Sequence, residues 1–321
     1  MSEHLIIRLP GKPVQHFRGE FKQVGVGYQF DGFVFSDFTH SRIFALELSD
    51  KNEKEDFTFH FASQEPYVIS PRDYILEANA LLNGFPVMNV EKAVYSRVKK
   101  HSFESKRAIE AFEKACELYP NACCYLVSSK LFGTWFGATP ELLLNTVENQ
   151  WNTMALAGTR SSASQEAWEE KEILEHQYVI DAVVEALQRS EAASIEVEET
   201  IEKIAGPVKH LYTPISAQGE PQKAWNFALD LHPTPAVCGT PRIAALDLLL
   251  SREMHERELY AGMFGWVSKE KTELYVNLRC AQLFENAAFL YVGGGYTKDS
   301  IPEKEWEETE HKANTLLKVF K

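Results

Sequence analysis

The sequence predicts an α+β fold with antiparallel sheets. Alternation of apolar and polar residues recurs along the chain, the predicted strands come in consecutive runs, and the helices are too few for a doubly wound fold. Predicted strands cover residues 21–38, 42–48, 57–61, 124–128, 142–147, 274–278 and 287–292. Predicted helices cover residues 104–118, 165–189 and 201–212, and a last helix follows Ser300.

No low-complexity tract, Pro/Ser-rich linker or internal repeat divides the 321 residues, so we expect a single domain over residues 1–321. The 45% hydrophobic and 25% charged fractions are typical of a globular protein. No apolar run approaches the roughly 20 residues that a membrane-spanning helix needs. The first ten residues lack the features of a signal peptide. We therefore expect a cytoplasmic protein with no membrane partner.

Charge and cysteine content argue against two further classes of protein. A formal net charge of -13 is unsuited to a nucleic-acid surface, so no nucleic-acid partner is expected. The 5 cysteines are an odd number without Cys-x-x-Cys spacing, which is typical of reduced thiols rather than of a disulfide framework or a zinc site. An anionic substrate would therefore need positive charge that the site itself supplies.

The C-terminal helix carries a charged stripe beside its apolar face. Ser300 is the predicted N-cap, and Glu303, three residues later, completes a predicted capping box. At about 3.6 residues per turn, Glu305, Glu308 and Lys312 lie next to the apolar arc of the helix. The stripe is either a solvated edge with a Glu308–Lys312 pair or part of a functional site.

The predicted helix over residues 165–189 places ionisable side chains against its apolar face. His176 and Glu172 project into the apolar arc, and Glu175 lies at its margin. Charged groups rarely lie there unless they are paired or bound to a metal. We expect Glu172 to satisfy His176 as a core histidine, and we take Glu175 as a candidate ligand. Carboxylate oxygens without thiolates favour a hard cation such as Mg²⁺.

Eight segments, taken together and in this order, resemble the chorismate-utilising enzyme family. They are EKAVYSR (91–97), FGATPELLL (136–144), ALAGTR (155–160), HPTPAVCGTP (232–241), LYAG (259–262), NLRCA (277–281), GGG (293–295) and EWEET (305–309). Each segment alone is a weak signal, but their collinearity over residues 90–321 is specific. The family includes isochorismate and salicylate synthases and the large subunits of anthranilate and aminodeoxychorismate synthases. The resemblance implies an α/β sandwich of large antiparallel sheets flanked by helices, with residues 1–89 as a shortened, β-rich N-terminal part.

The resemblance also implies a role for each matching residue. Glu175 and Glu308 resemble the carboxylates that hold Mg²⁺, with Glu305 alongside through water. Lys92 resembles the general base and Glu141 the general acid. The implied substrate-binding residues are Gly158, Thr159, His232, Ala236, Tyr260, Arg279, Gly293, Gly295 and Lys312. Among these, Arg279 and Tyr260 resemble contacts to the pyruvyl carboxylate of chorismate, and His232 resembles a site histidine.

Two positions indicate the isochorismate synthase type, in which water adds at C2 of chorismate and the C4 hydroxyl leaves, reversibly and with Mg²⁺. A lysine at position 92 goes with water as the nucleophile, so no glutaminase subunit is expected. Ala236 goes with release of isochorismate, whereas relatives that eliminate pyruvate typically have threonine there. Glu141 must stay protonated to act as an acid, so we expect burial to raise its pKa.

Other functions remain open at this point. A salicylate synthase, or component I of anthranilate or aminodeoxychorismate synthase, shares most of these residues. A catalytically silent chorismate-binding scaffold is the alternative outside enzymes, and the complete set of Lys92, Glu141, Glu175 and Glu308 argues against it. The product of the expected reaction would serve menaquinone, siderophore or salicylate synthesis, from a monomer or a weak homo-oligomer.

Overall fold

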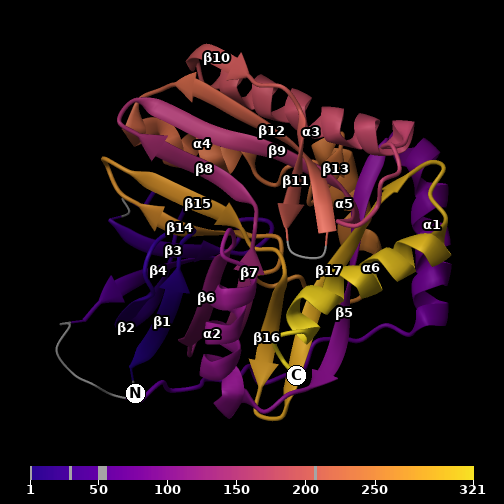
Figure 1. The fold of residues 1–321 in the computed structure, drawn as a ribbon. Helices are drawn as coiled ribbons and strands as arrows, with labels where there is room; N and C mark the ends of the chain where they lie inside the picture. The colour runs from indigo at the N-terminus through magenta and orange to yellow at the C-terminus, as the bar shows by residue number, and fades with distance from the viewer. Residues whose placement is uncertain (1, 29–30, 50–55, 206–207) are drawn as a thin grey trace.

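The computed structural model describes residues 2–28, 31–49, 56–205 and 208–321. The helices are α1 (Pro71–Met88), α2 (Ala108–Leu118), α3 (Glu170–Arg189), α4 (Ala224–Leu231), α5 (Arg242–Arg252) and α6 (Pro302–Leu317). The strands are β1 (Glu3–Arg8), β2 (Gln15–Val24), β3 (Gly32–Ser36), β4 (Ile43–Leu48), β5 (Lys92–Ser102), β6 (Cys123–Ser129), β7 (Gly133–Thr139), β8 (Leu142–Val147), β9 (Gln150–Ser161), β10 (Ala193–Val197), β11 (Ile201–Ala205), β12 (Val208–Gln218), β13 (Gly239–Thr240), β14 (Met263–Val267), β15 (Thr272–Val276), β16 (Cys280–Phe284) and β17 (Ala287–Thr297). The expected α+β class is confirmed (Figure 1).

All strand pairs in the described part of the chain are antiparallel and form one continuous path. The path runs β12–β9–β8–β15–β14–β3–β4–β2–β1–β6–β7–β16–β17–β5–β13, and β10 and β11 also pair with β12. Neighbouring strands on this path often come from distant parts of the sequence. The β5–β17 pair, for example, joins Lys92 to Thr297.

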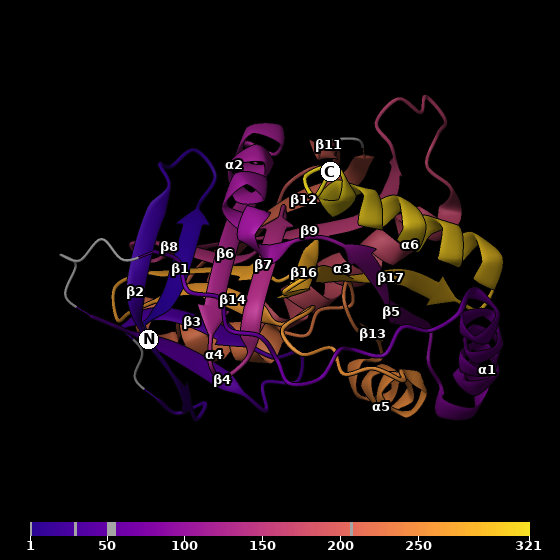
Figure 2. The same cartoon turned by 90° about the horizontal axis from the view of Figure 1, so that it is seen from below.

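The strands separate two hydrophobic cores, a larger one and a smaller one. Along β6, Tyr125 belongs to the larger core, whereas Cys124 and Leu126 belong to a smaller core under α2 and α6, because successive side chains of a strand point to opposite faces. Tyr125 also contacts the ring of Phe35 on β3, at 5.4 Å between centroids, and that of Phe264 on β14, at 4.8 Å, so the path folds over and these strands face each other. Figure 2 shows α2 and α6 on one side of the strands and α4 and α5 on the other.

Three of the predicted helices and strands differ from the structure. Residues 201–205 and 208–212 lie in the antiparallel strands β11 and β12 instead of a helix. Residues 57–61 form no strand: Phe57 and Phe59 pack against the smaller core as an irregular segment. The predicted strand over residues 21–38 is the end of β2 and then β3. Helices α1, α4 and α5 were not predicted, although Ser70 accepts a hydrogen bond from the Asp73 amide as an N-cap of α1.

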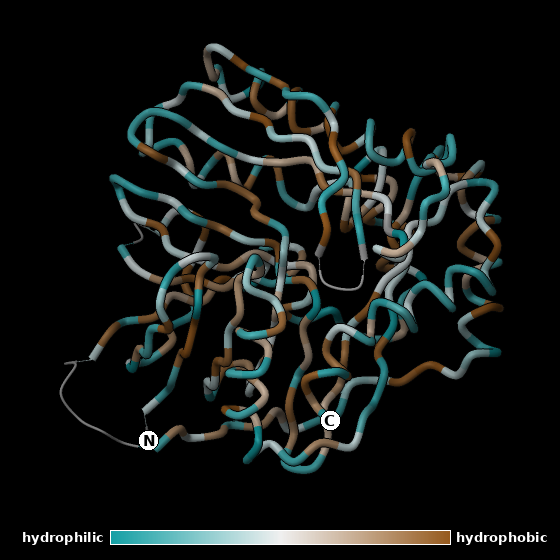
Figure 3. Tube along the Cα trace, in the orientation of Figure 1, coloured by the Kyte–Doolittle hydropathy of each residue, from teal (hydrophilic) through white to brown (hydrophobic). Residues whose placement is uncertain are grey.

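Other expectations agree with the structure. Hydrophobic and hydrophilic residues alternate along several strands (Figure 3), as the sequence pattern indicated. The predicted helix over residues 104–118 is α2 with a preceding turn, and that over residues 165–189 is α3, which begins at Glu170. All five cysteines are free. In the described part of the chain, no helix is both long and apolar enough to cross a membrane.

Candidate active site

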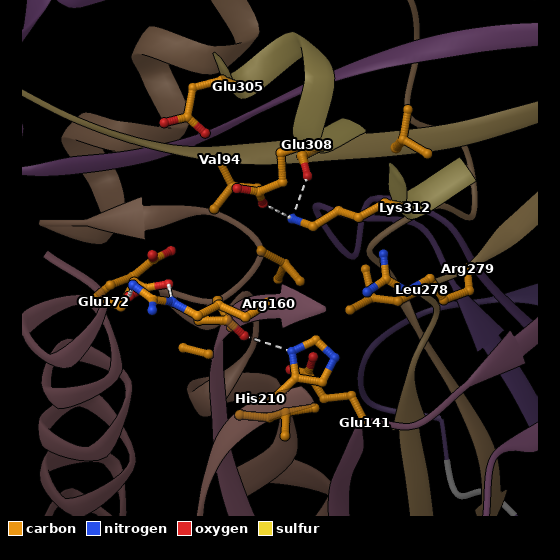
Figure 4. A pocket seen from close by; sticks show the side chains of 18 of the residues that line it. Val94, Glu141, Arg160, Glu172, His210, Leu278, Arg279, Glu305, Glu308 and Lys312 are labelled. Carbon is orange, nitrogen blue, oxygen red and sulfur yellow. Dashed lines mark hydrogen bonds and ion pairs between the residues drawn. The ribbon is translucent and has the colours of Figure 1, made fainter. Parts of the chain in front are cut away.

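Most of the predicted site residues line one pocket, a cavity of about 260 Å³ (Figure 4). They are Lys92, Glu141, Gly158, Glu175, Ala236, Tyr260, Arg279, Gly293, Glu305, Glu308 and Lys312. These side chains come from β5, β9, α3, β17, α6 and the loops between strands, so the long-range strand pairing brings them together.

Lys92 begins β5 and is fully buried. In the antiparallel ladders it lies opposite Thr240 on β13 and Thr297 on β17. Its Nζ atom is 2.8 Å from Oε1 of Glu175 on α3. The contact is an ion pair rather than a well-directed hydrogen bond, because the geometry gives Nζ no hydrogen-bond partner. Glu175 thus neutralises the ammonium group of Lys92 and connects β5 to α3.

Glu141 lies between β7 and β8, and its side chain is buried. Its amide donates a hydrogen bond of 3.3 Å to the hydroxyl of Thr139. Burial raises the pKa of Glu141 to about 7, although the positive charges of Arg279, Lys92 and Lys312 act in the opposite direction. The direction agrees with the expectation from the sequence. A carboxyl group with this pKa is protonated in a large fraction of molecules at neutral pH and can therefore donate a proton.

Arg279 presents unpaired donors to the pocket (Figure 4). Its backbone has a left-handed conformation with φ of 49°, and its carbonyl accepts a hydrogen bond of 3.0 Å from the Ala138 amide on β7. Among the described residues, its guanidinium has no hydrogen-bond or ion-pair partner. Burial lowers the pKa of Arg279, but a guanidinium stays charged in proteins. Such a group is suited to binding a carboxylate through two parallel hydrogen bonds.

The two acidic side chains that α6 contributes to the pocket are each paired with a lysine. Lys312 Nζ lies 2.6 Å from Glu308 Oε1 and donates a 2.8 Å hydrogen bond to the carbonyl of Gly293. Lys171 on α3 lies 2.7 Å from Glu305 Oε1. Burial alone would raise the pKa of Glu308, but Lys312 and other cations lower it, whereas burial and then the charge of Glu308 raise the pKa of Glu305.

Ser300 is not the N-cap of α6, so the predicted capping box with Glu303 is wrong. The helix begins at Pro302 after Ile301, and no side chain caps it. The Ser300 hydroxyl instead donates a 2.9 Å hydrogen bond to Glu305 and accepts one of 3.0 Å from Lys171. The Ser300 hydroxyl therefore binds Glu305 rather than the end of the helix, because a buried carboxylate needs hydrogen-bond donors.

The predicted metal ligands fit a divalent cation in chemistry and charge. Glu305 Oε2 is buried without a hydrogen-bond partner, so it offers a free acceptor. Glu305 and Glu308 repel each other, and a cation would relieve this repulsion. In the described part of the chain, no three acidic, histidine or cysteine side chains already form a metal-binding cluster. Binding would therefore require a carboxylate to exchange its lysine partner for the cation.

The glycines of residues 293–295 on β17 make room for these acidic side chains. A Cβ atom at Gly295 would collide with the Glu175 carboxylate, and one at Gly294 would lie 3.3 Å from Glu305 Oε2. Gly293 would bring a Cβ to 2.9 Å from the Tyr260 hydroxyl. Gly295 therefore supports the site from behind Glu175 rather than lining the pocket.

The histidine that lines the pocket is His210, which was not predicted, whereas His232 lies outside it. His232 is buried and donates a 2.8 Å hydrogen bond to the Ala261 carbonyl, and its other ring nitrogen lies 3.0 Å from that of His40. His210 on β12 donates a 2.6 Å hydrogen bond to the Gly158 carbonyl. Burial lowers the pKa of His210 to about 3, so its ring is neutral at pH 7.

Two of the predicted substrate-binding residues, Gly158 and Thr159, are neighbours on β9. Gly158 has φ of 65°, and a Cβ there would lie 3.1 Å from the ring of Trp168, which favours glycine. Thr159 follows it on β9, but its side chain lies outside the described part of the structure.

His176 is buried as expected, but its predicted partner is wrong. Its Nε2 atom lies 2.7 Å from the hydroxyl of Thr213 on β12. Glu172 instead accepts hydrogen bonds of 2.8 and 2.5 Å from Arg160 on β9. Residues 208–218, predicted in part as a helix, form a strand that brings Thr213 to the histidine.

A family model described as "Chorismate binding enzyme" matches residues 37–321, which is most of the chain. The chain belongs to the chorismate binding enzyme family. The resemblance found in the sequence is thereby confirmed, and the pocket described above is the candidate active site of a member of this enzyme family.

Individual members of the family are also similar. Isochorismate synthase EntC of Escherichia coli K12 is 35% identical over 201 residues, which are 59% of this chain and 51% of the relative. Isochorismate synthase DhbC of Bacillus subtilis 168 is 36% identical over 201 residues, 58% of this chain and 50% of the relative. The chain therefore spans about half the length of these relatives.

A solved structure shares the fold over nearly its whole length. It is described as a putative 2,3-dihydroxybenzoate-specific isochorismate synthase, DhbC, from Bacillus anthracis. Its TM-score is 0.81 at 24% identity, and the match covers 99% of this chain and 96% of that chain. This likeness confirms the expected architecture of large antiparallel sheets flanked by helices.

Proposed function

We propose that this protein is an isochorismate synthase that interconverts chorismate and isochorismate with Mg²⁺. The observation that carries the proposal is the set of groups in one pocket: Lys92, a buried Glu141 with a pKa of about 7, and the unpaired guanidinium of Arg279. The names of the similar curated proteins support the same reaction. Water as the nucleophile requires no ammonia, so the proposal includes no glutaminase subunit.

The proposed substrate is a dianion, and positively charged groups in the pocket neutralise its two carboxylates. Arg279, with the Tyr260 hydroxyl beside it in the pocket lining, binds the pyruvyl carboxylate. Lys312 and Gly158 also line the pocket, and we assign Lys312 and the segment that begins at Gly158 to the ring carboxylate. Mg²⁺, held by Glu175 and Glu308 with Glu305 alongside, would supply positive charge that neutralises the ring carboxylate. Local cations of this kind allow a protein of net charge -13 to bind an anionic substrate.

Two residues of the chain move the protons. Lys92 must separate from Glu175 and release its ammonium proton to solvent, and as the neutral amine it then accepts a proton from the water that attacks C2. Glu141 donates a proton to the C4 oxygen as it leaves, and its raised pKa keeps this proton available near pH 7. His210 stays neutral and hydrogen-bonded to Gly158, so it shapes the pocket without adding charge.

The direct test is to incubate the purified protein with chorismate and Mg²⁺ and to identify the product by NMR. We expect a mixture of chorismate and isochorismate that forms equally from either compound. Lys92→Ala protein, purified in the same way, controls for contaminating enzymes and should lose at least about 99% of the turnover. Absence of isochorismate from active-site-intact protein would refute the proposal.

Product fate depends on position 236, which lines the pocket. The methyl group of Ala236 leaves the ring and side chain of bound isochorismate free to relax and depart. A threonine adds a hydroxyl and a branch at Cβ, which would hold the product in the arrangement that eliminates pyruvate. We expect little pyruvate from the native protein and more from Ala236→Thr, as followed with a coupled lactate dehydrogenase assay. Stoichiometric pyruvate from the native protein would instead identify a salicylate-type synthase.

A further inference from the structure

Strand β5 loses its strand partner on one side immediately beside the pocket. β13 consists only of Gly239 and Thr240, which pair with the first two residues of β5. One residue further, the Val94 amide still donates a 2.6 Å hydrogen bond to the Cys238 carbonyl. Beyond this point, the Val94 carbonyl and the Ser96 amide need other partners, because buried backbone groups are rarely left unpaired.

An ion pair between Glu253 and Arg257 takes the place of the missing strand. Arg257 donates a 2.6 Å hydrogen bond to the Val94 carbonyl, and Glu253 accepts one of 2.8 Å from the Ser96 amide. Arg257 and Glu253 are joined by two hydrogen bonds, each of 2.7 Å. The other branch of the guanidinium donates a 2.8 Å hydrogen bond to the Val237 carbonyl. One side chain therefore contacts both β5 and the segment that contains Ala236.

Both members of the pair are buried, with 4% of each side chain exposed. Burial opposes charge on both, but their mutual attraction lowers the pKa of Glu253 and raises that of Arg257, so both remain charged. The guanidinium also lies 4.1 Å from the centre of the Phe38 ring, which fixes its plane. A group held from several sides in this way transmits its position to the backbone that it binds.

We propose that Arg257 is a positioning residue that sets the separation of two walls of the pocket. One wall is the start of β5, with Lys92 and Val94, and the other is formed by Ala236 and Val237. This inference deepens the proposed function and rests on it, because one wall carries the proposed base and the other faces the product. Arg257 itself does not line the pocket, so it acts through the backbone of these two segments.

The test replaces Arg257 by lysine. Lysine retains the charge and can pair with Glu253, but its single nitrogen cannot reproduce the guanidinium fork to both carbonyls. Since small displacements of reacting groups are costly, we expect kcat to fall by roughly tenfold to a hundredfold while KM changes by less than about threefold. The proportion of pyruvate among the products of Arg257→Lys should also differ from wild type, which overall loosening of the protein would not produce.

The matched control is Arg8→Lys. Arg8 is another buried arginine that donates to backbone carbonyls, those of Cys116, Tyr119 and Pro120, and none of these residues lines the same pocket. Arg8→Lys should lower the free energy of unfolding without changing kcat. Hydrogen exchange followed by mass spectrometry provides a readout that needs no turnover: residues 94–96 and 236–239 should exchange faster in Arg257→Lys and not in Arg8→Lys.

Glu253→Gln provides a second variant if Arg257→Lys fails to fold. It keeps the shape of the side chain and should speed exchange of the Ser96 amide and lower kcat in the same direction. Unchanged exchange and a kcat within threefold of wild type in a folded variant would overturn the proposal, as would an equal loss of kcat in Arg8→Lys. A wild-type protein without turnover would overturn the proposed function, while the exchange data would still decide whether Arg257 holds the two walls.

Discussion

The side chain of Glu141 makes the pH dependence of the reaction a test of one residue. Its pKa is raised to about 7, mainly by burial, so the protonated acid falls about tenfold for each pH unit above 7. We expect kcat/KM to decline above about pH 7 with the same slope. Glu141→Gln should lower kcat at least about a hundredfold. Residual activity of this variant should also lose the decline.

A pH profile of unfolding provides the control for this prediction, because it separates loss of the acid from loss of the fold. If Glu141→Gln turned over within a few-fold of wild type, or kept the alkaline decline, another group would be the acid.

Single residues also show what the sequence could and could not predict. Lys92, Glu141 and Arg279 were predicted from short segments, and the structure brings them into one pocket. The site histidine was assigned to His232, because its segment resembles the family, yet the pocket contains His210. The missed signal was the pair of β-branched residues Thr213 and Ile215 after it, together with Tyr212, which favours a strand.

The C-terminal element depends on packing beyond the end of α6. Phe320 is buried, and its ring contacts those of Phe103 at 4.4 Å and Phe136 at 5.1 Å between centroids. Phe320→Ala should destabilise the protein by about 3–5 kcal/mol, because it leaves a cavity in the smaller core. We expect a lower midpoint in denaturant unfolding. The kcat of the folded protein should remain near wild type, since Glu305 and Glu308 lie earlier on the helix.

Val87→Ala on α1 is the control for Phe320→Ala. Val87 is 83% exposed, so its truncation should leave the unfolding midpoint unchanged. A loss of kcat in folded Phe320→Ala would show that the end of α6 reaches the chemistry as well as the core.

Elements differed in how well their sequences predicted them. α2 and α3 have clear amphipathic spacing and were predicted to within a few residues. Residues 201–212 were predicted as a helix, but residues 201–205 and 208–212 lie in two strands, because the pairing of β12 with β9 and with β11 outweighs local helical spacing. Ser300 was predicted as a cap, but the buried carboxylate of Glu305 binds its hydroxyl. Local signals fail where a tertiary partner offers a stronger interaction.

The strand order belongs to the whole molecule, and no local pattern could predict it. β14 pairs with β3, from residues more than two hundred positions earlier, and β17 pairs with β5. These pairings place Lys92 opposite Thr297 and hence near α6. The family resemblance supplied the sandwich of large antiparallel sheets flanked by helices but not the strand order, and periodicity supplied only the class.

The excess of acidic residues means that the proposed Mg²⁺ binding should also affect the thermal stability of the whole molecule. The chain has 46 acidic and 33 basic residues, and the three predicted ligands come from α3 and α6, which are distant in sequence. The proposed cation, if held by both helices, would bind the folded chain and not the unfolded one. It should therefore stabilise the fold by about 2.7 kcal/mol at a Mg²⁺ concentration one hundred times its Kd. We expect Mg²⁺ to raise Tm by several degrees in thermal unfolding.

Glu308→Gln distinguishes specific binding from general screening of negative charge. It removes a proposed ligand but leaves 45 of the 46 acidic residues, so screening would raise the Tm of the variant as much as that of wild type. Specific binding predicts a Tm increase in wild type that is largely lost in Glu308→Gln and is not produced by NaCl at equal ionic strength. Equal increases in both proteins would remove the stability argument for a metal between α3 and α6. They would also leave the Lys312–Glu308 pair as a structural contact in its own right.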